Sequence, residues 1–116
     1  MKDIAKIKTV YTHGSVFHAD DVFSTALILL LKPNVDVVRI VSMDVAQKMD
    51  EKEDCLVYDI GEGEYDHHQK NKARRPMEDG WYTEKDGTVM AIPYCSFGLL
   101  WKDYGHLLCS VLYRRR

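Results

Sequence analysis

The sequence predicts an α/β domain built from helices packed on a mostly parallel β-sheet. Segments rich in β-branched and aromatic residues alternate along the chain with segments whose apolar residues recur at helical spacing. Residues 55–61 (CLVYDIG) begin with a continuous apolar run, which is typical of a parallel strand covered on both faces. Since neither an internal repeat nor an interdomain linker interrupts the alternation, we expect a single domain over residues 1–116.

A strand and a helix are expected first. Residues 6–13 (KIKTVYTH) mix β-branched and aromatic side chains and predict a strand that ends at His13. Residues 19–32 carry two aspartates in the first turn, where carboxylates interact favourably with the helix dipole, and Pro33 ends this helix. The residues expected on its apolar face are Val22, Phe23, Ala26, Leu27, Leu30 and Leu31.

The middle of the chain predicts two further strands with a short polar segment between them. The strands are expected at residues 35–42 and 55–61, and residues 44–54 are expected to form a short helix or a turn. The third strand ends in Asp59, Ile60 and Gly61, and a carboxylate and a glycine at such an end are typical of a buried parallel strand that leads into an active-site loop.

The last third of the chain begins with a polar stretch. Residues 69–88 include four basic residues between positions 70 and 75, followed by a proline and a glycine, and predict a mobile basic loop. Residues 96–105 return to helical spacing and predict a final helix. Its expected apolar stripe consists of Phe97, Leu100, Trp101 and Tyr104.

Composition and charge limit the partners and the cellular compartment that this protein can have. The formal net charge of −2 gives no overall attraction to nucleic acid or membranes, so an anionic partner must be held by a local site. The N-terminus lacks the apolar region of a secretory signal, and the longest apolar run, residues 26–31, is too short to span a membrane. We therefore expect a cytoplasmic protein with no membrane partner. Cys55, Cys95 and Cys109 are widely spaced, and we expect reduced, mostly buried thiols.

Potential ligand residues gather in two short stretches. One is residues 13–21 (HGSVFHADD), at a predicted strand-to-helix junction, and the other is residues 59–69 (DIGEGEYDHHQ), after a predicted strand. Both stretches follow the carboxyl ends of predicted parallel strands, where ligands bind in an open α/β sheet. We therefore expect the two stretches to form one site.

The residue types in these stretches predict a metal site. The candidate ligands are His13, His18, Asp20, Asp59 and His67, with Asp66 and His68 beside them. Imidazole and carboxylate without thiolate suit Mn²⁺, Fe²⁺ or Zn²⁺ better than Ca²⁺. So many ligands would serve two ions about 3.5–4 Å apart, which would generate a hydroxide and clamp both oxygens of an in-line displacement. Asp59 would bridge them.

Other interpretations remain open for each of these residues. A single histidine is more often a structural hydrogen-bonding residue than a ligand, and the aspartates at 20 and 21 could cap a helix. The basic residues Lys70, Lys72, Arg74 and Arg75 could contact phosphate or form a solvated loop. Trp81, Tyr82 and Tyr94 could stack on bases or pack within the protein. The GEG at 61–63 is not a dinucleotide fingerprint, and no nucleotide cofactor is expected.

Three stretches carry a family resemblance. In order they read THGSVFHADDVFSTALILL, VYDIGEGEYDHHQK and IPYCSFGLLWKDYG, and the resemblance extends over nearly the whole chain. They resemble the N-terminal half of the MYG1 family (UPF0160), within the DHH phosphoesterase superfamily. The resemblance implies a Rossmann-like, three-layer DHH domain that binds two divalent metals, usually Mn²⁺ with Mg²⁺ or Zn²⁺ as alternatives.

The resemblance also implies an activity. Family members are linked to phosphodiester hydrolysis, with a 3′–5′ RNA exonuclease activity attributed to the eukaryotic ones. It assigns the metal ligands to His13, His18, Asp20, Asp59 and His67. His68 would face the scissile phosphate, with Asp66 beside it as a catalytic residue. The expected partner is therefore a phosphodiester such as RNA.

The resemblance covers only part of the family pattern. Relatives continue with a further ligand aspartate and a second domain, so this chain is expected to be a truncated member that lacks the second domain. The alternative function is a catalytically inactive metal-binding remnant or interaction module. Metal-dependent hydrolysis of proteins is a third possibility from the ligands alone, but the sequence lacks the HExxH helix that would support it.

Overall fold

The centre of the protein is a parallel β-sheet. The computed structural model describes residues 1–14, 16–66 and 74–114. In this part of the chain, β1 (Thr9–His13), β2 (Asp36–Ile40) and β3 (Cys55–Val57) form one sheet in the order β2-β1-β3. Both pairings are parallel, with Val10 opposite Val37 on one side and Leu56 on the other. The predicted α/β fold with a mostly parallel sheet is thereby confirmed.

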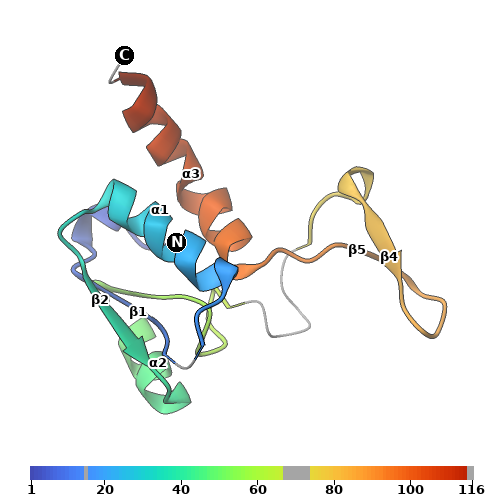
Figure 1. The fold of residues 1–116 in the computed structure, drawn as a ribbon, viewed down its shortest axis with the longest axis horizontal. Coiled ribbons are helices and arrows are strands. Elements are labelled where there is room, and N and C mark those ends of the chain that lie inside the picture. The colour runs from blue at the N-terminus through green and yellow to red at the C-terminus, as the bar shows by residue number, and fades with distance from the viewer. Residues whose placement is uncertain (15, 67–73, 115–116) are drawn as a thin grey trace.

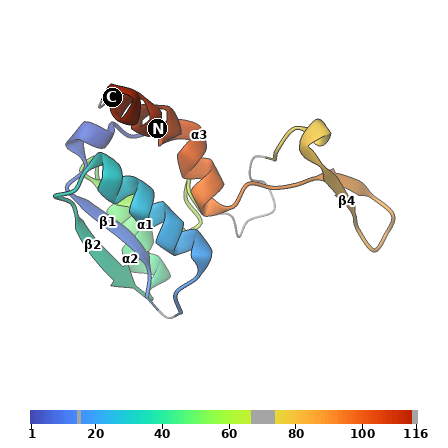
Figure 2. The ribbon, with the colours of Figure 1, turned by 45° about the horizontal axis from the view of Figure 1, so that its top comes forward.

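Helices cover both faces of this sheet. Because β2 and β3 lie on opposite sides of β1, right-handed crossovers place α1 (Ala19–Leu31) and α2 (Met43–Asp50) on opposite faces. Figures 1 and 2 show α1 beside α3 (Ser96–Arg114) on one side of the sheet and α2 on the other. The arrangement is Rossmann-like. The core between the sheet, α1 and α3 contains Val10, Leu27, Ile28, Leu56, Tyr58, Leu100 and Tyr104.

The buried face of α1 differs from the predicted one. The helix buries Asp21, Ser24, Leu27 and Ile28, whereas Val22, Phe23 and Leu30 are exposed. The reason is that buried polar groups on this face have partners, so their burial is stabilised by hydrogen bonds. The side chain of Asp21 pairs with Arg39, and Ser24 Oγ donates to the carbonyl of Asp20. Periodicity alone therefore oriented this helix wrongly.

The stretch expected to be a loop contains a hairpin in its described part. A short 3₁₀ helix (Met77–Asp79) precedes β4 (Trp81–Thr83), which pairs with β5 (Val89–Ala91) in antiparallel fashion. The signals for this hairpin are the aromatic and β-branched WYT and the Asp86-Gly87 turn. In Figure 1 the hairpin extends away from the sheet and helices, and the radius of gyration of 15.3 Å exceeds the about 13 Å typical of a compact domain of this length.

The last helix is longer than predicted. It continues to Arg114 instead of ending at Gly105. Gly105 leaves room for the Trp101 side chain, because a Cβ at this position would lie 2.6 Å from it. The glycine therefore serves packing inside the helix and does not mark its end. Apolar residues continue beyond it, and Leu108 reaches the core.

Two further expectations concern the cysteines and membrane-spanning helices. Cys55 is buried, but Cys95 and Cys109 are exposed, so the expectation of mostly buried thiols is wrong; all three are free. Within the described ranges, no helix combines the length and apolar character needed to cross a membrane.

Candidate metal centre

The candidate site lies where the direction of the strand order reverses. The chain leaves β1 toward β2 on one side, and β3 lies on the other side of β1. Ligands of open α/β sheets bind in the crevice at the carboxyl ends of two such neighbouring strands. His13 is the last residue of β1, and Asp59 follows β3 by two residues. The two predicted stretches therefore meet at this crevice.

One imidazole nitrogen lies against two carboxylates. His13 Nε2 is 3.0 Å from Asp21 Oδ2 and 3.0 Å from Asp59 Oδ2. Both aspartates are buried, with relative exposures of 0% and 3%. Two carboxylates that converge in a buried place need positive charge between them, because an uncompensated buried charge is strongly destabilising. This geometry favours a cation at His13 Nε2.

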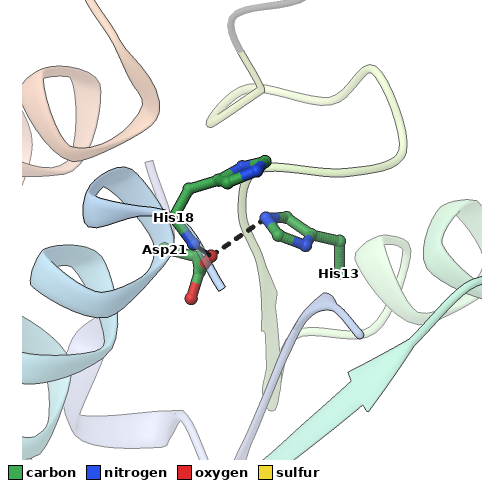
Figure 3. Close-up of side chains that lie close together, drawn as sticks. All are labelled: His13, His18 and Asp21. Carbon is green, nitrogen blue, oxygen red and sulfur yellow. Dashed lines mark hydrogen bonds and ion pairs between the residues drawn. The ribbon is translucent and has the colours of Figure 1, made fainter. Parts of the chain in front are cut away.

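His18 completes a group of three ligand atoms. The ligand atoms of His13, His18 and Asp21 all lie within 4.8 Å of one another, so the triad could hold a metal ion. Figure 3 shows the two imidazole rings next to each other with Asp21 beside them, and the ring centroids are 5.2 Å apart. His18 precedes α1, and its backbone N–H donates to Asp21 Oδ2 at 2.7 Å. The start of α1 thus fixes the spacing of the triad.

Arg39 on β2 supports this triad. Its Nη2 donates to Asp21 Oδ1 at 3.0 Å, its Nη1 donates to the carbonyl of His13 at 3.0 Å, and its guanidinium lies 3.9 Å from the centre of the Phe17 ring. Burial opposes ionisation of Asp21, but the hydrogen bonds from the His18 backbone and from Arg39 outweigh it and lower the pKa of Asp21. Asp21 is therefore held as a carboxylate.

An unusual backbone turn presents Asp59 to the site. Asp59 and Glu62 have positive φ values of 60° and 57°, and Gly61 has a φ of 89°. Aspartate tolerates this left-handed conformation better than most residues do. The Asp59 N–H donates to the carbonyl of Tyr65 at 2.9 Å, which ties the turn to the chain that returns. The Asp59 Oδ1 atom accepts a hydrogen bond from Ser96 Oγ at 3.1 Å.

A cavity of about 320 Å³ connects these groups. Its lining consists of His13, His18, Met43, Asp59, Ile60, Glu62 and Asp66. Asp66 is buried, and its Oδ2 accepts from the Glu62 N–H at 2.9 Å. Four of the sequence-predicted site residues, two histidines and two aspartates, therefore share one cavity.

Asp20 has different surroundings. Its Oδ2 accepts from the Ser96 N–H at 3.0 Å and its Oδ1 from the Phe97 N–H at 2.7 Å, so the carboxylate caps the start of α3. Asp20 as a metal ligand stays a prediction, and it is Asp21 that lies with the two histidines. The sequence offered Asp21 only as a helix cap. Both aspartates are acidic neighbours on α1, and the sequence does not say which of them faces His13.

Of the remaining predicted site residues, only the two arginines belong to the part of the chain that the structure describes. His67, His68, Lys70 and Lys72 lie outside the described residues, so their predicted roles stay predictions. Arg74 donates to the carbonyl of Ala91 at 2.5 Å and to Tyr82 Oη at 3.3 Å. Arg75 Nε lies 3.8 Å from an oxygen of Asp79. Arg74 thus contacts the hairpin and Arg75 the 3₁₀ helix before it, and a substrate role for both also stays a prediction.

Fold and site together define an α/β protein with a candidate metal centre at the carboxyl edge of a parallel sheet. Residues 9–115 match the family MYG1_exonuc, described as "Uncharacterised protein family (UPF0160)", and the chain belongs to this family. The predicted family is thereby confirmed, and membership of the DHH superfamily stays a prediction. No curated protein and no solved structure matches the chain.

Proposed function

We propose that this chain is a metal-dependent phosphoesterase domain that hydrolyses phosphodiester bonds, with RNA as the expected substrate. The observation that carries the proposal is the approach of two buried carboxylates, Asp21 and Asp59, to His13 Nε2 in the crevice of the sheet. The name of the matched family, MYG1_exonuc, supports a nuclease reaction.

The donor set fits a divalent ion of intermediate hardness. His13, His18 and Asp59 line the cavity, and Asp21 lies with the two histidines; this mixture of imidazole and carboxylate suits Mn²⁺ or Zn²⁺, with Mg²⁺ as a harder alternative. His13, His18, Asp21 and Asp59 would hold the ion. A bound ion would polarise a phosphoryl oxygen and neutralise the charge that develops on it.

The chain's own residues would then provide binding and orientation. His18 is exposed, so it lies on the open side of the site, whereas Asp59 and Asp66 form its buried wall. A substrate phosphate would approach from the His18 side, because the buried carboxylates would repel it from the other. His68 is proposed to face that phosphate on the strength of the family resemblance alone.

We also propose a second ion at the same site, with Asp59 shared between the two. Asp66 is on the same cavity wall and would contribute to this second position together with His67. Two ions would neutralise both the attacking and the leaving oxygen of the reaction.

One observation favours the alternative, a domain that binds metal without turnover. The Asp20 carboxylate, expected as a ligand, has both oxygens engaged by backbone N–H groups of α3. If these bonds persist when metal binds, the described residues supply donors for one ion better than for two. Such a domain would keep the fold and one ion but would lack the charge needed for hydrolysis.

Calorimetric titration with Mn²⁺, combined with an assay of Mn²⁺-dependent hydrolysis of a bis-aryl phosphodiester, tests the proposal. Asp59→Asn should lower the Mn²⁺ stoichiometry and abolish hydrolysis. Asp36→Asn is the matched control, because Asp36 is exposed at the start of β2, at the opposite end of the sheet. One ion without turnover in the parent would favour the alternative, and an absence of metal binding would contradict both.

A further inference from the structure

Ser96 links the last helix to the candidate metal centre. It is the first residue of α3, and it is fully buried. Its Oγ donates to Asp59 Oδ1 at 3.1 Å, across a separation of 37 residues in the sequence. The capping position before the helix belongs to Cys95, whose Sγ accepts from the Gly98 N–H at 3.4 Å. Here the hydroxyl proton is directed at another part of the chain.

Because of this contact, the two oxygens of the Asp59 carboxylate have different partners. Oδ1 accepts from Ser96, and Oδ2 lies 3.0 Å from His13 Nε2. We propose that Ser96 is a positioning residue that makes Asp59 bind divalent ions through Oδ2 alone, so that two ions at this centre would share that one oxygen. This inference rests on the proposed function, because it concerns the ion at the same centre.

Ser96 is itself held firmly in place. Its backbone N–H and that of Phe97 both donate to the Asp20 carboxylate, at 3.0 and 2.7 Å. Further along the helix, Leu100 and Tyr104 are fully buried in the core. The hydroxyl is therefore presented by a helix anchored on one side by α1 and on the other by the core. A ligand oriented by a rigid neighbour keeps its geometry more precisely than one left free to rotate.

The Ser96 hydrogen bond limits how many oxygens Asp59 can offer to an ion. Without the Ser96 hydroxyl, Asp59 could turn and bind the ion through both oxygens. The coordination number of the ion would then rise, and Asp59 would lose its fixed orientation. Loss of such an outer partner commonly lowers metal affinity by about 10–100-fold.

The test uses Co²⁺, which reports coordination through its visible absorption. For Ser96→Ala we expect about 10–100-fold weaker Co²⁺ binding and a weaker, shifted visible band, because the coordination number rises. Ser96→Thr keeps the hydroxyl and should restore the parent's spectrum and affinity. Ser24→Ala is the matched control: Ser24 is also fully buried, but its hydroxyl donates to the backbone carbonyl of Asp20.

A second arm shows whether Ser96 acts through Asp59. In the Asp59→Asn background, Ser96→Ala should weaken Co²⁺ binding by less than threefold, since the carboxylate ligand that Ser96 orients is gone. If Ser96→Ala does not fold, as judged by circular dichroism, Ser96→Cys replaces it. A thiol is a weaker donor, so its affinity should fall between those of the parent and a variant without the bond.

The outcomes separate this inference from the proposed function. A parent that binds Co²⁺, with a Ser96→Ala or Ser96→Cys variant of unchanged spectrum and affinity, would overturn the role of Ser96 and leave the metal centre intact. Equal losses in Ser96→Ala and Ser24→Ala would also overturn it, because they would point to general destabilisation. A parent that binds no divalent ion would overturn both proposals.

Discussion

His13 Nε2 and Asp59 Oδ2 lie 3.0 Å apart, at the ends of two neighbouring parallel strands. Their meeting follows from the strand order, because β3 pairs directly with β1 although β2 comes between them in the sequence. A parallel sheet places the carboxyl ends of neighbouring strands at one edge. The topology alone therefore brings an imidazole and a buried carboxylate together.

Substitution of His13 should remove metal binding with little effect on the fold. For His13→Gln we expect Mn²⁺ affinity to fall by more than the about 10–100-fold that loss of an outer partner costs, because a direct ligand is lost. His106→Gln is the control, since His106 is exposed on α3. Isothermal titration calorimetry measures both. Equal affinities in the two variants would remove His13 from the site.

The two adjacent aspartates of α1 should separate in their effects. Asp21→Asn should weaken metal binding, because Asp21 belongs to the triad with His13 and His18. Asp20→Asn should instead lower the free energy of unfolding by about 0.5–2 kcal/mol, because its carboxylate caps α3. Urea unfolding and Mn²⁺ titration of both variants distinguish the roles. A larger loss of metal affinity in Asp20→Asn would restore the ligand set implied by the family resemblance.

Most of the fold was predictable from the sequence, because helical periodicity and strand signals mark the same elements that the structure shows. The first two strands and first two helices lie within a few residues of their expected ranges, and the predicted clusters at the strand ends do share a cavity. The orientation of α1 was not predictable, because it depends on the pairing of Asp21 with Arg39 from another strand. The same tertiary contact decides which aspartate faces His13. Local sequence carries no information about such a partner.

Alkaline pH should weaken the fold through Tyr58. Burial, the largest cause, raises the pKa of Tyr58 to about 12, while its hydroxyl shares a 2.6 Å hydrogen bond with Thr25 Oγ1. Since the pKa is higher in the folded state, the neutral phenol contributes stability that is full below about pH 10 and is lost as the pH rises toward 12. The contribution is about 2–3 kcal/mol.

Tyr58→Phe provides the test of this pH dependence. Its free energy of unfolding should decline less than the parent's between about pH 10 and pH 12, since phenylalanine has no proton to lose. Tyr113→Phe, at an exposed position, should follow the parent. Denaturant unfolding at several alkaline pH values measures the difference. Parallel declines in all three proteins would show that Tyr58 is not responsible.

Lys2 should stabilise the connection between α2 and β3. Lys2 Nζ donates to the carbonyls of Asp50, Lys52 and Cys55 at 2.5, 2.9 and 2.7 Å. For Lys2→Met we expect a loss of about 1.5–3 kcal/mol in the free energy of unfolding, because hydrogen bonds to a charged donor are lost. Lys6→Met, at an exposed position, serves as the control. Thermal and urea unfolding measure both, and equal stabilities would show that the contacts of Lys2 contribute nothing.

The most direct test of the metal centre is an anomalous difference map from crystals of the protein soaked in Mn²⁺. We expect a peak about 2 Å from both His13 Nε2 and Asp59 Oδ2, with Asp21 and His18 around it. Crystals of Asp59→Asn, soaked in the same way, should show a weaker peak or none. A parent structure with no peak at the carboxyl ends of β1 and β3, or with manganese bound only elsewhere, would contradict the assignment.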